Sequence, residues 1–197
     1  MTQPPGHASS PLSEEHLRQL GAAQFAMKKI RRAVSYAKFD GWTIGIFGAL
    51  SLVCGFNSFV GVAMAIGLLS VAWIELNEAK KLARLDPAAP RTLAFNQLAL
   101  AGLLIAYALW RIHEETSGQG IIAAAQSSDP EVAKMLKPYE DLGPLFAYAI
   151  YGALICVAVF AQGGTALYYF TRATLLQNYV AHTPPWIVEM QRTGAPL

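Results

Sequence analysis

Four polar side chains lie inside long apolar stretches of this sequence, where they could take part in chemistry. They are Asn96, Gln97, Gln162 and Thr165. Amides and hydroxyls at such positions can line the path of a solute, or they can form hydrogen bonds between neighbouring helices. We favour hydrogen bonding between two helices, one carrying Asn96 and Gln97 and the other carrying Gln162 and Thr165.

No motif for catalysis, cofactor binding or metal binding stands out. The sequence contains no HExxH, GxSxG or phosphate-binding-loop pattern, and its four histidines lie outside the apolar stretches. Ser51 and Ser70 have no histidine or lysine within those stretches to activate them. His113, beside Glu114 and Glu115, could join a metal site between subunits, although a lone surface histidine is the commoner case. We therefore predict no catalytic residue, no cofactor and no metal.

The elements that position these residues follow from where charge is missing. The 197 residues are 54% hydrophobic and 14% charged, against about 25% charged in ordinary soluble domains. Three stretches carry no charge: Gly41 to Ile74, Thr92 to Trp110 and Leu142 to Thr171. This pattern is typical of membrane-spanning helices and excludes a soluble globular domain, a disordered chain, a collagen and a disulfide scaffold. Asp40 and Glu75 lie just outside the first stretch, so we expect both at the inner membrane surface.

We predict an all-α membrane protein with four transmembrane helices. At ~1.5 Å per residue, 41–74 is far too long for one crossing. Turn-forming residues lie at 54–58, so we expect 41–76 to form a tight transmembrane hairpin of two spans. The third and fourth spans are 92–111 and 144–171. The other segments are a flexible start (1–12), an amphipathic basic helix on the cytoplasmic face (13–40), a cytoplasmic helix extension and loop (77–91), an outer loop with a short helix (112–143) and a cytoplasmic tail (172–197).

Basic residues predict the orientation of these spans. Twelve of the 15 Lys and Arg residues lie on the side that holds both predicted termini. The remaining three are Arg111, Lys134 and Lys137. Because basic residues are enriched on the cytoplasmic side of membranes, both termini should be cytoplasmic. We predict an integral protein of a bacterial inner (cytoplasmic) membrane. The net charge of +2 is too small to indicate a nucleic-acid partner.

A helix is predicted to begin after Ser13, a residue favoured as an N-cap. Its apolar residues recur at helical spacing and form one stripe, made of Leu17, Leu20, Met27, Ile30 and Val34. Basic residues flank the stripe at Lys28, Lys29, Arg31 and Arg32. One interpretation places this helix on the inner leaflet, with the four basic side chains on lipid headgroups. The equally weighted alternative is a helix packed on a protein partner.

Small residues at helical spacing predict close helix packing within the membrane. They are Gly41 and Gly45, Gly102 and Ala106, Gly152 and Cys156, and the pair Gly163 and Gly164. The adjacent glycines also predict a kink or a close contact in the last span. The pattern leaves open whether these contacts form within one chain or between subunits.

These features favour a non-catalytic membrane protein that serves as an accessory or scaffold subunit of a larger complex. Its expected partners are the lipid bilayer and other membrane subunits, or further copies of itself. One alternative is a small homo-oligomeric channel or solute transporter lined by the four polar side chains. A second is a membrane-shaping protein that uses the 41–76 hairpin as a wedge. An enzyme is the least favoured class.

Overall fold

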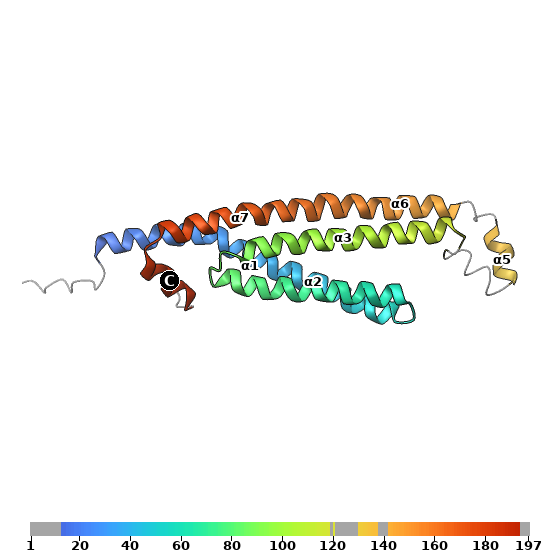
Figure 1. Ribbon diagram of the computed structural model, residues 1–197, viewed down its shortest axis with the longest axis horizontal. Coiled ribbons are helices and arrows are strands. Elements are labelled where there is room, and N and C mark those ends of the chain that lie inside the picture. The colour runs from blue at the N-terminus through green and yellow to red at the C-terminus, as the bar shows by residue number, and fades with distance from the viewer. Residues whose placement is uncertain (1–12, 119, 121–129, 138–141, 194–197) are drawn as a thin grey trace, which may run out of the picture.

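The structure, a computed structural model, describes residues 13–118, 120, 130–137 and 142–193, and these residues are almost entirely helical (Figure 1). The elements are α1 (Glu14–Gly55), α2 (Phe59–Ala83), α3 (Ala89–Thr116), α5 (Pro130–Leu136), α6 (Leu142–Val157), the π-helical turn η2 (Ala158–Gln162), α7 (Gly163–His182) and α8 (Pro185–Arg192). Because α6, η2 and α7 follow one another without a break, Leu142–His182 forms a single rod.

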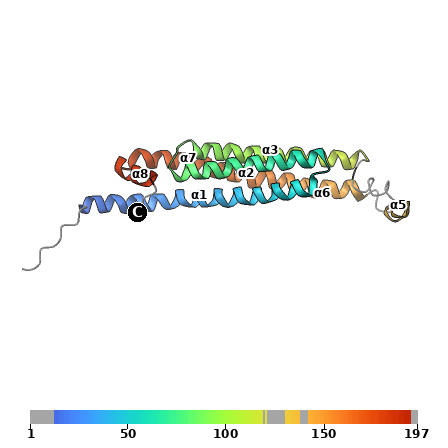
Figure 2. The same cartoon turned by 90° about the horizontal axis from the view of Figure 1, so that it is seen from below.

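The long helices lie side by side as two hairpins, which gives the described chain an elongated shape (Figure 1). One hairpin consists of α1 and α2, and the other consists of α3 and the rod α6–η2–α7. We call the end that holds the start of α1 together with α8 the polar end. The opposite end, which holds the turn between α1 and α2, is the apolar end. Figure 2 shows that α1 runs along the bundle between these two ends.

The turn between α1 and α2 lies within the segment 54–58, where the sequence predicts a reversal. α1 ends at Gly55, and the side chain of Ser58 caps α2 by accepting a hydrogen bond from the backbone N–H of Gly61. Gly55 and Gly61 bring the two backbones together. A Cβ atom on Gly61 would lie 2.5 Å from the carbonyl oxygen of Gly55, so only glycine fits there.

The seam between α1 and α2 uses the first pair of predicted packing residues. A Cβ atom on Gly41 would lie 2.9 Å from Cγ of Leu76, and one on Gly45 would lie 3.6 Å from Cβ of Ala72. Gly48 similarly faces Leu69. The Gly41–Gly45 pattern therefore packs within this chain.

The predicted boundary between 13–40 and 41–76 is not a helix end, because α1 is one helix of 42 residues. Ser13 caps it as predicted, by accepting a hydrogen bond from the backbone N–H of His16. Met27, Ile30 and Val34 from the predicted stripe are buried against this same chain, so the helix needs no other surface to cover them. The four basic residues beside the stripe, Lys28, Lys29, Arg31 and Arg32, are exposed.

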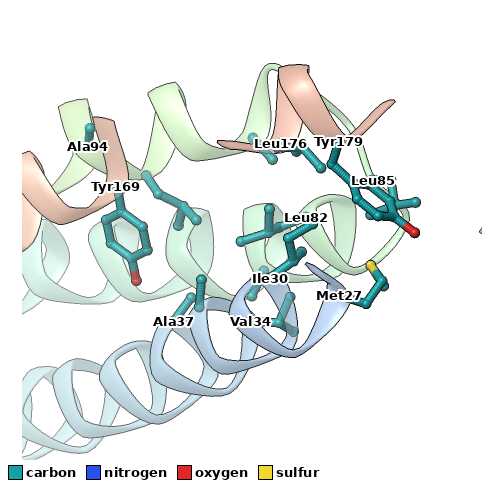
Figure 3. Close-up of a cluster of buried hydrophobic side chains, with 14 of the residues drawn as sticks. Met27, Ile30, Val34, Ala37, Leu82, Leu85, Ala94, Tyr169, Leu176 and Tyr179 are labelled. Carbon is teal, nitrogen blue, oxygen red and sulfur yellow. The ribbon is translucent and has the colours of Figure 1, made fainter. Parts of the chain in front are cut away.

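The larger hydrophobic core lies at the polar end, where five helices meet (Figure 3). Ile30 of α1, Leu82 of α2 and Leu176 of α7 are almost completely buried there. Leu93 of α3 and Ile187 of α8 join the same cluster. A smaller cluster lies toward the apolar end, around Ile44, Leu68, Val71, Ala72 and Leu100. The two hairpins are therefore held together mainly at the polar end.

Leu85 connects α2 to α3 in a backbone conformation that leucine rarely adopts. Its φ angle is 61°, in the left-handed region that usually calls for glycine at the end of a helix. The backbone N–H of Leu85 donates a hydrogen bond to the carbonyl oxygen of Leu82, and that of Asp86 donates to the carbonyl oxygen of Lys81. Such bonds commonly close the C-terminus of a helix. The Leu85 side chain is completely buried in the large core, and this burial offsets the backbone strain.

Three of the described helices are long and apolar enough to cross a membrane: Phe59–Ala83, Ala89–Thr116 and Leu142–His182. The first predicted span is not among them, because only 15 residues of α1 follow Asp40. Large exposed apolar side chains concentrate at 39–73, 95–110 and 142–167. Apolar side chains exposed in such numbers are typical of a surface that faces lipid.

Candidate functional site

A buried polar cluster lies where the apolar part of the bundle meets the large core. It consists of Asp40 from α1, Glu75 from α2, Asn96 and Gln97 from α3, and Tyr169 from α7. Glu75, Gln97 and Tyr169 have no exposed surface. The cluster thus joins all four long helical segments at one level of the bundle.

Two neutral donors hold the Glu75 carboxyl group. The Tyr169 hydroxyl donates to Oε1 at 3.0 Å, and Nδ2 of Asn96 donates to Oε2 at 2.8 Å. The same Asn96 nitrogen lies 3.0 Å from the carbonyl oxygen of Val71. Both oxygen atoms of Glu75 therefore accept hydrogen bonds, and α2 is tied to α3 and α7.

Asp40 lies beside Glu75 and has its own donor. Nε2 of Gln97 donates to Oδ2 of Asp40 at 2.5 Å, which ties α1 to α3. The two carboxyl groups lie near one another, because adjacent residues of α3 donate to them. Their proximity follows from Gly41, because a larger residue there would collide with Leu76 and Glu75 of α2.

No basic side chain neutralises these carboxyl groups in the described part of the chain. The ion pairs there join Lys81 to Glu78, and Arg111 to both Glu114 and Glu115. Oε1 of Gln97 is buried without a hydrogen-bond partner, although Nε2 of the same amide contacts Asp40. Buried charge without a counter-charge is costly, as is a buried acceptor without a donor.

A lateral groove of about 550 Å³ leads from the cluster toward the apolar end. It lies between the α1–α2 hairpin on one side and α3, α6 and η2 on the other. Asp40 and Gln162 line it, and Gly55 and Gly61 line it at the turn. α1 packs along α2 and against α7, whereas the groove separates it from Leu154 of α6. Figure 1 shows the two hairpins diverging toward the apolar end.

The structure places the four predicted polar residues in different surroundings. Asn96 and Gln97 bond to Glu75 and Asp40, so the expected hydrogen bonds from these amides to Gln162 and Thr165 are not formed. Gln162 lines the lateral groove. The Thr165 hydroxyl bonds to the Tyr36 hydroxyl at 3.3 Å and donates to the carbonyl oxygen of Ala161 at 2.9 Å.

Sequence reasoning missed three members of the cluster: Asp40, Glu75 and Tyr169. It assigned both carboxyl groups to the membrane surface because they stand at the ends of a charge-free stretch. One available signal was that Asn96 and Gln97 lie within the first six residues of their own stretch. Residues at the ends of adjacent antiparallel spans meet at one level of a bundle.

A second polar group lies toward the apolar end of α3. The Arg111 side chain donates to the Tyr151 hydroxyl at 3.0 Å and forms ion pairs with Glu114 and Glu115. Tyr107 packs edge-on against Tyr151. Across the described residues, no group of three or more His, Cys, Asp or Glu side chains is arranged to hold a metal ion.

The remaining small residues predicted to pack do not do so within this chain. Nothing lies within 4 Å of a Cβ atom placed on Gly102, Gly152, Gly163 or Gly164. Ala106 and Cys156, their predicted neighbours in the spacing pattern, are exposed. η2 comes directly before Gly163 and Gly164, so the predicted irregularity in this helix takes the form of a widened turn.

Comparison with protein families, with curated proteins and with solved structures finds no match for this chain.

Proposed function

We propose that this chain is an integral membrane protein with four spans, the apolar part of α1 being the first. α1 packs along α2, so any crossing by α2 brings α1 with it. Arg91 and Arg111 of α3 are 20 residues apart, which is ~30 Å along a helix and matches the hydrocarbon thickness. Distribution of the basic residues supports a cytoplasmic location for the polar end.

Within this proposed frame, the chain acts as a non-catalytic accessory or scaffold subunit of a larger membrane complex. The observation that carries the proposal is the open space over Gly102 and Gly152. Helices associate in lipid chiefly through close packing, and small residues permit it. α3 and α6 therefore offer surfaces on which helices of another subunit can pack at short distance.

A small homo-oligomeric channel or transporter is the second candidate. The lateral groove favours it, because Asp40 and Gln162 give this apolar space two polar groups. Asn96 and Gln97 do not favour it, since both amides are buried and engaged with carboxyl groups. The scaffold role explains the open space over the glycines, so we give it precedence.

Assembly can be tested by filling the open space. Gly152→Leu should remove the chain from its complex in native membranes, because the longer side chain blocks close helix contact. Ala153→Leu, at the exposed neighbouring position, is the matched control and should leave the complex intact. The measurement is the mass of the complex by native mass spectrometry after mild detergent extraction. A wild-type chain that extracts as a monomer from its native membrane contradicts the scaffold role.

Four spans predict that the first half of α1 and the end of α3 lie on opposite sides of the membrane. In a background without Cys54 and Cys156, Ser35→Cys and Ser117→Cys introduce thiols at two exposed positions. A membrane-impermeant maleimide applied to intact cells should label the Ser117 variant, and the Ser35 variant should react only after permeabilisation. If both variants react from the same side, α1 does not cross.

A further inference from the structure

The buried polar cluster lies inside the bilayer if the chain has the four proposed spans. Asn96 is five residues beyond Arg91, so it lies ~7 Å inside the inner edge of the hydrocarbon. Asp40 and Glu75 lie at the same level, since they bond to Gln97 and Asn96. Carboxyl groups in such a position are costly and commonly mark sites that bind or move ions.

The donors around the two carboxyl groups supply no positive charge. Tyr169, Asn96 and Gln97 are all neutral, so their hydrogen bonds stabilise the carboxyl groups without cancelling charge. Neither Asp40 nor Glu75 belongs to an ion pair of the described residues. Two neighbouring carboxylates in a low-dielectric interior repel each other strongly. One added positive charge removes that repulsion, and the remaining negative charge already has its donors.

One buried oxygen atom of the cluster has no hydrogen-bond partner. Oε1 of Gln97 is completely buried and accepts no hydrogen bond, and it belongs to the amide that contacts Asp40. Carboxylate and amide oxygens are the donors that hard cations prefer, and the cluster contains both kinds. The charge balance calls for one positive charge, so the cluster suits a monovalent ion.

The lateral groove gives a cation access to the cluster. Asp40 lines the groove as well as belonging to the cluster, and Thr43 and Gln162 give the same region further polar atoms. We infer that Asp40, Glu75 and Gln97 form a binding site for one small monovalent cation, reached through the lateral groove. This site is separate from the assembly surfaces on α3 and α6.

The test uses the purified full-length protein and sodium as the probe. Thermal unfolding is followed in sodium chloride and in choline chloride at equal ionic strength, because choline is too large for the site. The wild-type midpoint should be higher in sodium by about 5–10 °C at a concentration ~100-fold above the dissociation constant. Asp40→Asn and Glu75→Gln should lose this difference, since each variant removes one of the two negative charges.

Glu78→Gln is the matched control. Glu78 is a buried carboxyl group three residues from Glu75, but it forms an ion pair with Lys81 and lies outside the cluster. This variant should keep the full sodium effect. Binding of radioactive sodium to the wild-type protein, at one ion per chain, provides a measurement that does not depend on whether a variant folds. Equal wild-type midpoints in sodium and choline, or a sodium effect that survives in both cluster variants, overturn the inference.

Discussion

Replacing Gly61 by leucine is expected to force the two helices of the first hairpin apart. A Cβ atom at this position would lie 2.5 Å from the carbonyl oxygen of Gly55 and 2.8 Å from its Cα atom. Both atoms belong to backbone, so no side-chain rotation can relieve the collision. Overpacking commonly costs about 1–3 kcal/mol, and we expect at least the upper value here. Equilibrium unfolding in mixed detergent micelles measures the loss.

Gly102→Leu is the control for this experiment. It makes the same change in α3, where nothing lies within 4 Å of the added Cβ atom. Because leucine favours helix more than glycine does, this variant should be as stable as the wild type or more stable by about 0.5–1 kcal/mol. Equal destabilisation by both substitutions would mean that the contact between Gly55 and Gly61 does not fix the turn.

The second large effect is expected at the polar end, from Leu176→Ala. Leu176 is completely buried in the large core, where Leu82 and Tyr179 also lie (Figure 3). This end lies in water in the proposed frame, so the substitution loses both the transfer free energy of the removed atoms and the contacts around the cavity. The free energy of unfolding should fall by about 3–4 kcal/mol.

Leu100→Ala separates these two contributions. Leu100 is 2% exposed and belongs to the smaller cluster, which the proposed frame places in the bilayer. Lipid tails are as apolar as leucine, so the substitution there loses packing but little transfer free energy. We expect a loss of about 1–2 kcal/mol. If Leu100→Ala costs as much as Leu176→Ala, the placement of the bilayer around the apolar end is wrong.

Local features of this fold could be predicted because single residues determine them. Ser13 caps α1 through a hydrogen bond to a residue three positions away. The chain reverses after Gly55, and the turn-forming residues that predict this reversal lie within a few positions of it. The irregular turn before Gly163 is likewise local. In each case the structural cause and the sequence signal occupy the same short segment.

The buried polar cluster could not be predicted in this way, because its members come from distant parts of the chain. Asp40 and Glu75 appear in sequence as the ends of one apolar stretch, which is where surface charges are also found. Their burial depends on the closeness of α1 and α2 at Gly41 and on the reach of Tyr169 from α7. The partners of Asn96 and Gln97 were mispredicted for the same reason: hydrophobicity locates a helix but does not give its rotation.

The unbroken course of α1 has a mechanical consequence. One stiff helix carries the exposed basic side chains near its start, Asp40 at its middle and one wall of the lateral groove beyond it. The first half of this helix is fixed in the large core and its second half packs along α2, so a change in the angle of the groove wall would have to disturb the core.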